Sequence, residues 1–392
     1  MNTKERNFAT DAIREQHPAS EFPEHSLPLY LTSSFVFDNA EQARAMFADE
    51  ITGNIYSRYS NPNTNEFIEK LCLLEGTEDG VATASGMAAM YSSMAALLKS
   101  GDHVLACRSV FGSTHQILNT IFPKFGISHT YADVTEPETW EAKIQSNTRM
   151  IFVETPSNPA LDIIDLEWLG KLAKKYNVIL NVDNCFATPY LQNPAKFGAH
   201  IVTHSATKFM DGQGRVIAGA ILGTAELIKE IRFFTRHTGP SLSPFNAWIL
   251  SKSLETLAVR MERHCQNALE LAEYLEKHNE VLLVKYPFLK SHPQHALATK
   301  QMKLGGGLVT FEVKGGLEKG REFLNSLKMI SHSPNLGDTR TIAIHPASTT
   351  HSKLSDAERA LVGITPGLIR IAVGLEDVKD IIKDIDQAIA SR

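Results

Sequence analysis

The amino-acid sequence predicts an α/β protein, in which a mostly parallel sheet covered by helices on both faces is followed by a smaller α+β domain. Between about residues 103 and 222, short apolar segments alternate with helical segments of roughly 10 to 15 residues. Wholly apolar strands are typical of a sheet that is buried on both faces. Beyond about residue 243 the alternation is less regular, and 392 residues are more than one compact core usually holds. We therefore expect two packed units.

The first sixty residues, 1–60, differ from the rest of the chain and are predicted to form an N-terminal arm. Their apolar residues are scattered, and prolines at 18, 23 and 28 interrupt any long helix. The stretch at 56–63, YSRYSNPN, is polar, aromatic and rich in turn-forming residues. Such a segment buries too little apolar surface to fold alone, so we expect it to pack on a neighbouring subunit or domain.

The region 61–250 is predicted to be the large domain, and it begins with two helices. The first covers Thr64–Leu74 and is closed by Gly76, a residue that suits the left-handed position after a helix. The second covers Gly86–Leu98, and a further helix covers Asp165–Lys175. The predicted strands are His103–Ala106, Ser128–Tyr131, Met150–Glu154, Val178–Val182, Ile201–His204 and Ile217–Leu222.

The region 251–392 is predicted to be the smaller α+β domain. A long helix leads into it from about Pro244 to His278, and we expect this helix to be broken or bent near its middle. Strand-like and helical segments then follow without regular alternation. The strands are Val281–Tyr286, Gly307–Val313, Thr341–Ile344 and Leu368–Val373, and the helices are Glu318–Ser326 and Asp377–Ile389.

Composition excludes several classes of protein. Lys and Arg total 39 against 44 Asp and Glu, so a net charge of −5 argues against a nucleic-acid binder with a broad basic face. No apolar run approaches the roughly 20 residues that span a bilayer, and no secretory signal is apparent. Four widely spaced cysteines fit reduced thiols better than disulfides or a zinc site. We expect a cytoplasmic enzyme with no metal, membrane or nucleic-acid partner.

Three short motifs together predict a site for pyridoxal 5'-phosphate (PLP). Lys208 follows a strand and is preceded by Ser205 and Thr207, which suits a Schiff-base amine beside hydroxyl groups that bind a phosphate. Asp183 ends a buried strand, where a carboxylate needs a cationic partner such as a pyridinium nitrogen. Ser85-Gly86-Met87 begins a helix, whose free N–H groups attract an anion. Taken singly, these residues are equally typical of a surface lysine, a capping carboxylate and an N-cap serine.

The chain resembles the Cys/Met-metabolism PLP-dependent enzymes. The resemblance extends over nearly the whole sequence and implies a fold type I, aspartate aminotransferase-like structure with a seven-stranded sheet. The matching motifs are Thr10–Arg14, Tyr56–Arg58, Glu154–Pro159, Val182–Asn184, Ser205–Lys208, His345–His351 and Ile369–Glu376.

The resemblance also implies a role for each matched residue. Lys208 would carry the cofactor and shuttle protons, and Asp183 would pair with the pyridine nitrogen. Arg370 would bind the α-carboxylate of the substrate, and Asn158, counted among the substrate residues, would lie near the cofactor hydroxyl. The phosphate would be held by Ser85, Gly86, Met87, Ser205 and Thr207, and by Tyr56 and Arg58 of the adjacent subunit in a tetramer built from two dimers.

Two segments resemble the O-succinylhomoserine sulfhydrylase branch of the family. In Ser109–Thr114, Phe111 takes the place of a tyrosine that stacks on the cofactor, which leaves Tyr56 and Lys208 as the proton carriers. In Asn335–Thr341, Arg340 replaces the glutamate of cystathionine-cleaving relatives, so we expect Arg340, with Thr341, to select a succinyl ester.

The expected reaction is a γ-replacement that converts O-succinylhomoserine and sulfide to homocysteine and succinate, a step of methionine biosynthesis. The alternatives are cystathionine γ-synthase, which uses cysteine as the thiol, and O-acetylhomoserine sulfhydrylase. Methionine γ-lyase is disfavoured because its members carry a reactive cysteine near the position of Ser113. A remote alternative is a protein that binds PLP without turnover. The sequence has no GxSxG elbow and no GxGxxG after a strand that would favour a hydrolase or a dinucleotide enzyme.

Overall fold

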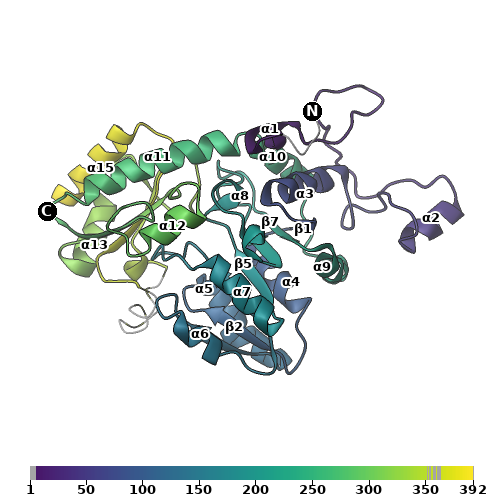
Figure 1. The fold of residues 1–392 in the computed structure, drawn as a ribbon. Coiled ribbons are helices and arrows are strands. Elements are labelled where there is room, and N and C mark those ends of the chain that lie inside the picture. Colours follow the sequence, from purple (N-terminus) through teal and green to yellow (C-terminus); the bar gives the residue numbers. More distant parts are fainter. Residues whose placement is uncertain (1–5, 351, 353–354, 356–358, 360–362, 392) are drawn as a thin grey trace.

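The fold consists of two sheets, each with its own layer of helices, and an arm that extends from the larger unit (Figure 1). The computed structural model describes residues 6–391 apart from 351, 353–354, 356–358 and 360–362. His351, the last residue of the predicted motif at 345–351, lies outside the described residues. The described part of the chain contains no helix long and apolar enough to cross a membrane.

The larger sheet has seven strands in the order β1-β7-β6-β5-β4-β2-β3. Strands β2 to β6 are mutually parallel, and β7 is antiparallel to both of its neighbours, β6 and β1. The strands are β1 (Asp79–Thr83), β2 (His103–Cys107), β3 (Ser128–Ala132), β4 (Thr148–Glu154), β5 (Ile179–Asp183), β6 (Ile201–His204) and β7 (Gly219–Gly223). Every residue of β2 and β5 is buried, and successive side chains point to opposite faces, so helices cover both faces of the sheet. The predicted fold class is confirmed.

Helices surround this sheet and form two apolar cores with it. One core joins α3, α10 and α11, and the other lies around β2, β4 and β5 with α4, α7 and α9. The helices are α3 (Pro62–Glu75), α4 (Gly86–Ala95), α5 (Gly112–Gln116), α6 (Glu138–Ala142), α7 (Leu166–Tyr176), α8 (Thr188–Leu191), α9 (Ala225–Thr238) and α10 (Pro244–Leu254), with short turns η2 (Ile117–Ile121), η3 (Phe122–Phe125) and η4 (Pro194–Phe197).

The smaller sheet has five strands in the order β10-β11-β12-β9-β8, and α11, α13 and α15 pack on it around a third core. Its strands are β8 (Val281–Lys285), β9 (Leu308–Val313), β10 (Ser331–His332), β11 (Ile342–Ile344) and β12 (Leu368–Ala372). Its helices are α11 (Leu257–Leu275), α12 (His295–Gln301), α13 (Gly316–Ser326) and α15 (Val378–Ala390), with the turn η5 (Pro346–Ser348).

One difference from the sequence-based expectations concerns the edge of the larger sheet. Strand β1 was not predicted, because Asp79 and Gly80 interrupt its apolar pattern at the edge of the sheet. The helix expected at 244–278 is broken, as predicted: it consists of α10 and α11, with the break at Glu255–Thr256. Helix α11 contributes to the first core with its first half and to the third core with its second half. The domain boundaries at 60 and 250 therefore stay predictions.

The arm is anchored at its base and projects at its middle. Helix α1 (Phe8–Arg14) packs on α3, and the Asn63 side chain donates to the carbonyl of Pro28. Helix α2 (Ala40–Phe47) lies at the far end of a segment that extends away from the body of the molecule (Figure 1). Val36 is 99% exposed and Leu31 69% exposed on this segment. Apolar side chains so exposed fit the expectation that the arm contacts another chain.

Candidate functional site

Strand direction brings the predicted site residues to one edge of the larger sheet. Strands β1, β2, β4, β5 and β6 all run the same way, because β1 and β6 are each antiparallel to β7. Their carboxyl ends therefore meet at one edge, where ligands of α/β sheets bind. A cavity of about 360 Å³ lies at this edge. Its lining includes Ser85 after β1, Phe111 after β2, Asn158 after β4, Asp183 at the end of β5, and Ser205, Thr207 and Lys208 after β6.

Lys208 is half-buried in this cavity and its amine has one polar contact. Its Nζ donates to Oδ1 of Asn335 over 2.7 Å. Burial lowers the pKa of the Lys208 amine; Cys185 opposes this lowering and the nearby Arg370 adds to it. A lysine with a lowered pKa is uncharged more often at neutral pH, and the uncharged amine is the nucleophile.

Two carboxyl groups end neighbouring strands at the floor of the cavity. Glu154 and Asp183 are partners in the β4–β5 register and are 5% and 6% exposed. Burial raises the pKa of Asp183 to about 6, and burial together with the charge of Asp183 raises the pKa of Glu154. Asp183 accepts the backbone N–H of Cys185, and Glu154 accepts that of Phe111 over 2.7 Å. No side-chain ion pair within the described residues neutralises Asp183, so a cationic ligand atom there would stabilise it.

The opposite end of the cavity is suited to an anion. Ser85 caps α4 by accepting the backbone N–H of Ala88, which leaves the first N–H groups of this helix directed outward. Gly86 lies so close to Ser205 that a Cβ on it would stand 2.5 Å from the Ser205 Cβ. The helix start and the turn after β6 are therefore in direct contact.

Arg370 reaches the same cavity from β12 in the smaller sheet. One terminal nitrogen donates to Oδ1 of Asn158 over 3.0 Å, and the other donates to the carbonyl of Asn335 over 3.1 Å. Its Nε is buried without a hydrogen-bond partner, and burial lowers the pKa of this guanidinium to about 10. A buried guanidinium without a carboxylate partner in the described chain is a ready site for a ligand carboxylate.

Four predicted site residues do not line this cavity. Arg340 pairs with Asp338, and its side chain is 65% exposed. Thr341 is buried, and its hydroxyl donates to Glu376. Tyr56 and Arg58 lie in the arm, where Arg58 stacks 4.7 Å from the Tyr59 ring and donates to the carbonyl of Arg236.

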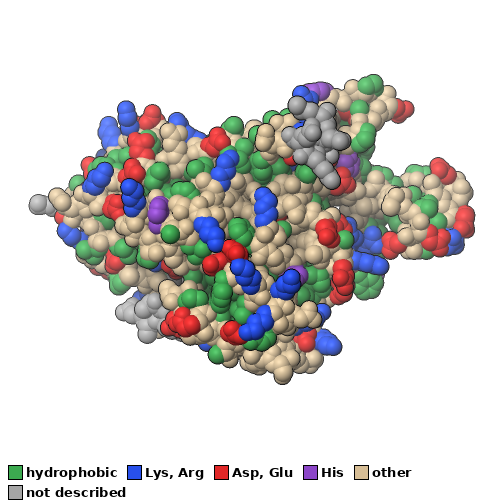
Figure 2. Space-filling model, in the orientation of Figure 1, with side chains coloured by type: hydrophobic (Ala, Val, Ile, Leu, Met, Phe, Trp, Pro, Cys, Tyr) green, Lys and Arg blue, Asp and Glu red, His purple; other side chains and the backbone are tan. Residues whose placement is uncertain are grey.

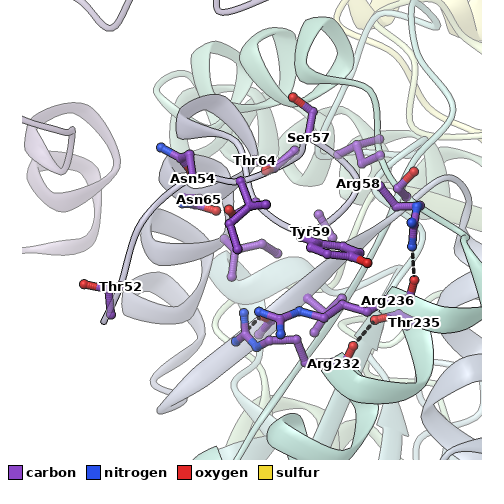
Figure 3. A pocket seen from close by; sticks show the side chains of 18 of the residues that line it. Thr52, Asn54, Ser57, Arg58, Tyr59, Thr64, Asn65, Arg232, Thr235 and Arg236 are labelled. Atoms are coloured by element: carbon purple, nitrogen blue, oxygen red, sulfur yellow. Dashed lines mark hydrogen bonds between the residues drawn. The ribbon is translucent and has the colours of Figure 1, made fainter. Parts of the chain in front are cut away.

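Arg58 instead lines a second pocket at the base of the arm, of about 600 Å³. Figure 3 shows Arg58 and Arg236 on the two sides of Tyr59, with Arg232 beside them. Arg232 pairs with Asp79 and Arg236 with Asp49, whereas Arg58 has no carboxylate partner within the described chain. Figure 2 shows acidic and basic side chains interspersed over the face it presents. The grouping of three arginines at the second pocket is therefore a local feature.

Sequence reasoning did not assign Glu154 and Asn335 to the site. Glu154 could have been identified by the signal that identified Asp183, a carboxylate at the end of an apolar strand. Asn335 carries no such signal, because its position beside Lys208 depends on how the two sheets pack.

Comparisons with known proteins agree with this geometry. The family model described as Cys/Met metabolism PLP-dependent enzyme matches residues 9–390. The chain belongs to this family. It is 47% identical to O-succinylhomoserine sulfhydrylase of Pseudomonas aeruginosa, over 98% of this chain and 95% of the relative. It is 44% identical to L-methionine gamma-lyase of Fusobacterium nucleatum, over 99% of each chain.

Solved structures of similar chains have the same fold. The crystal structure of metB from Corynebacterium glutamicum is 36% identical, with a TM-score of 0.93 over 99% of each chain. A Campylobacter jejuni structure that contains N'-pyridoxyl-lysine-5'-monophosphate is 34% identical, with a TM-score of 0.95 over 98% of this chain and 100% of that chain. As a member of the Cys/Met metabolism family, this chain is a PLP-dependent enzyme.

The residues of the cavity fit PLP. Asp183 is a buried carboxylate without a cationic partner in the described chain, as a protonated pyridine nitrogen requires. Lys208 supplies the amine, and the start of α4 faces the same cavity and suits the phosphate. Phe111 offers an aromatic face at the rim, where it is 45% exposed.

Proposed function

We propose that this chain catalyses γ-replacement, in which O-succinylhomoserine and sulfide give homocysteine and succinate in methionine biosynthesis. One observation carries the proposal: Lys208, Asp183 and Arg370 face a single cavity, although they come from two different sheets. The identity of 47% to one O-succinylhomoserine sulfhydrylase and 43% to another, from Mycobacterium tuberculosis, supports the specific reaction.

Each of these residues would have a separate task. Arg370 would bind the α-carboxylate and so orient the amino acid, with Asn158 holding the guanidinium in place. Bound PLP would supply the electron sink that makes the Cα proton removable, and Asp183 would keep the pyridine nitrogen protonated. Lys208, once displaced by the substrate amine, would take the proton from Cα. Loss of a second proton, from Cβ, would leave the electron pair that expels succinate from Cγ, and both protons would return after sulfide has added at Cγ. Phe111 has no hydroxyl, so Lys208 and Tyr56 are the proton carriers of the proposal.

The site would be completed by a second copy of the chain. Tyr56 and Arg58 do not line the cavity of their own chain, and Arg58 lacks a carboxylate partner within the described residues. We assign both to the phosphate of a neighbouring subunit in a tetramer made of two dimers. This assembly follows from the family resemblance, a cytoplasmic location follows from the cysteine pattern, and both belong to the proposal.

Methionine γ-lyase activity is a second candidate, because relatives with that name are 43 to 44% identical over 98 to 99% of this chain. A γ-lyase would release the thiol and leave a ketoacid, without an external thiol. The serine at position 113, where lyases of the family carry a reactive cysteine, favours the γ-replacement.

The deciding experiment incubates the purified PLP-loaded enzyme with O-succinylhomoserine or O-acetylhomoserine, each with sulfide or with cysteine, and in parallel with methionine alone. Homocysteine from the succinyl ester and sulfide is the expected main product. Cystathionine as the main product would assign the chain to cystathionine γ-synthase, and a preference for the acetyl ester to the acetylhomoserine enzymes. Methanethiol and 2-ketobutyrate from methionine alone, at a higher kcat/KM, would assign it to the γ-lyases.

A further inference from the structure

The loop at 334–338, which precedes β11, lies across the cavity and contacts the residues of the proposed site from the side of the smaller sheet. Pro334 and Leu336 line the cavity, and Asn335 between them is half-buried. The Asn335 side chain accepts the amine of Lys208 over 2.7 Å, while its carbonyl accepts a terminal N–H of Arg370 over 3.1 Å. One residue therefore contacts both of the cationic side chains that the reaction needs.

The backbone of this loop fits tightly against the segment that carries Lys208. Gly337 has φ +78°, and a Cβ on it would stand 2.5 Å from the backbone nitrogen of Phe209 and 2.8 Å from the carbonyl carbon of Lys208. Only glycine allows both this conformation and this approach. The position of Asn335 relative to Lys208 is thus fixed by backbone packing between Gly337, two residues beyond Asn335, and the backbone of Lys208 and Phe209.

Arg340, held by an ion pair with Asp338, links the end of the loop to the segment beyond Lys208 through one hydrogen bond. Asp338 is 7% exposed and accepts Nε and a terminal nitrogen of Arg340 over 2.9 and 3.0 Å. Arg340 also donates to the carbonyl of Gln213 over 3.2 Å. These contacts hold the carboxyl-terminal end of the loop in place. They also show that Arg340 makes its contacts outside the cavity.

We propose that Asn335 is a positioning residue for Lys208, whose side-chain carbonyl receives the lysine amine when that amine is not bonded to the cofactor. An amide oxygen at this distance holds the nitrogen at the border between the two sheets, next to Arg370. A substrate whose carboxylate is bound by Arg370 has its Cα close to that guanidinium, so the amine waits near the carbon from which it takes the proton. The proposal depends on the proposed function only through the role of Lys208.

The effect of a substitution at Asn335 on the pKa of Lys208 depends on the charged groups around that amine. Cys185 after β5 and Arg370 on β12 act on the Lys208 amine, and the carboxyl groups of Asp183 and Glu154 line the same cavity. The amide oxygen accepts a hydrogen bond and therefore favours the charged amine. Asn335→Ala should lower the pKa of Lys208, because it removes a hydrogen bond to the charged amine. Asn335→Asp should raise it.

The test uses the full-length chain, loaded with PLP and then stripped to the apo form. Only the uncharged amine recombines with added PLP, so the pH profile of recombination, followed by visible absorbance, reports the Lys208 pKa. The midpoint should move to lower pH in Asn335→Ala and to higher pH in Asn335→Asp. Asn119→Asp, which adds the same charge at an exposed position, should leave the midpoint unchanged. Reloaded Asn335→Ala should lose about tenfold in kcat with a smaller change in KM.

The outcomes separate this proposal from the proposed function. If both Asn335 variants melt like the wild type and recombine with an unmoved midpoint, Asn335 does not position Lys208. If the variants differ from the wild type only in melting temperature, the residue is merely structural and the proposal is equally overturned. Failure of the wild-type apo chain to recombine with PLP would instead contradict the role of Lys208, on which the proposed function rests.

Discussion

At the scale of single residues, the site combines side chains that are each poorly satisfied without a ligand. Among the described residues, Asp183 is a buried carboxylate without a cationic partner, and Arg370 is a buried guanidinium with an unpartnered Nε. Burying charged groups in this way destabilises a chain unless ligands compensate. The residues that weaken the empty fold are therefore the ones that we propose to recognise cofactor and substrate.

Replacement of Lys208 tests the proposed chemistry directly. Lys208→Ala should abolish the visible absorbance of the lysine-bound cofactor and lower kcat by at least about 10³-fold, because both the covalent attachment and the proton carrier are lost. Absorbance spectra and a homocysteine assay measure the two effects. Turnover near the wild-type level in this variant would contradict the assignment.

Arg370 should determine binding of the α-carboxylate. Arg370→Lys keeps the charge but removes the planar pair of donors, so KM for the amino-acid ester should rise by roughly 10- to 100-fold. The affinity for PLP, measured by equilibrium dialysis, should change little by comparison. An unchanged KM would show that the carboxylate binds elsewhere.

Asp183 should make the stability of the apo chain depend on pH. Its folded-state pKa of about 6 lies above the ordinary value of 3.8, so the folded chain holds this proton more tightly than the unfolded chain does. This stabilisation is complete below about pH 4 and is lost as pH rises through about 6, by roughly 3 kcal/mol at most. Urea unfolding at pH 4 to 8, compared between wild type and Asp183→Asn, isolates the effect. A difference between the two chains that does not change with pH would refute it.

At the scale of elements, the site depends on where strands end and helices begin. Contact between the start of α4 and the turn after β6 requires glycine at position 86, where a Cβ would stand 2.5 Å from that of Ser205. Gly86→Ala should push the helix start away from that turn and weaken PLP binding by about tenfold or more.

A matched control is available at the start of α5. A Cβ at Gly112 would meet nothing within 4 Å, so Gly112→Ala should leave PLP affinity unchanged and stabilise the chain slightly, by about 0.5 kcal/mol. Fluorescence titration of apo chains with PLP compares the two variants. Equal affinities for both would show that the approach of α4 to β6 is unimportant for the phosphate.

At the scale of the whole molecule, the proposed assembly can be tested by mixing two inactive variants. Lys208→Ala and Arg58→Ala chains each lack one part of a shared site. If Arg58 serves the neighbouring subunit, a mixed dimer contains one intact site, and random reassociation should restore about a quarter of wild-type activity. Activity that stays at the sum of the separate variants would contradict sharing. Analytical ultracentrifugation of the wild type then distinguishes dimer from tetramer.

The sequence allowed the fold class and the sheet-edge residues to be predicted, because both depend on local patterns. Apolar strands followed by Asp183 or by the Ser205–Lys208 motif can be recognised within a few residues. The contact between Lys208 and Asn335 could not be predicted, since 127 positions separate them and the two sheets must pack first. Arg340 was expected to bind substrate; it pairs with Asp338, two residues away, and does not line the cavity, so that role stays a prediction. No local sequence pattern distinguishes an arginine that faces a substrate from one that pairs with a nearby carboxylate.

The arrival of Arg370 from β12 has a thermodynamic consequence. Its guanidinium reaches across from the smaller sheet to Asn158, which follows a strand of the larger one. A carboxylate bound to Arg370, as proposed for the substrate, would stabilise the side chain that links the two sheets, so its binding free energy should add to their mutual cohesion. Amines without a carboxylate can reach Lys208 but cannot make this contact with Arg370. Amino acids should therefore raise the melting temperature of the enzyme more than amines that lack a carboxylate.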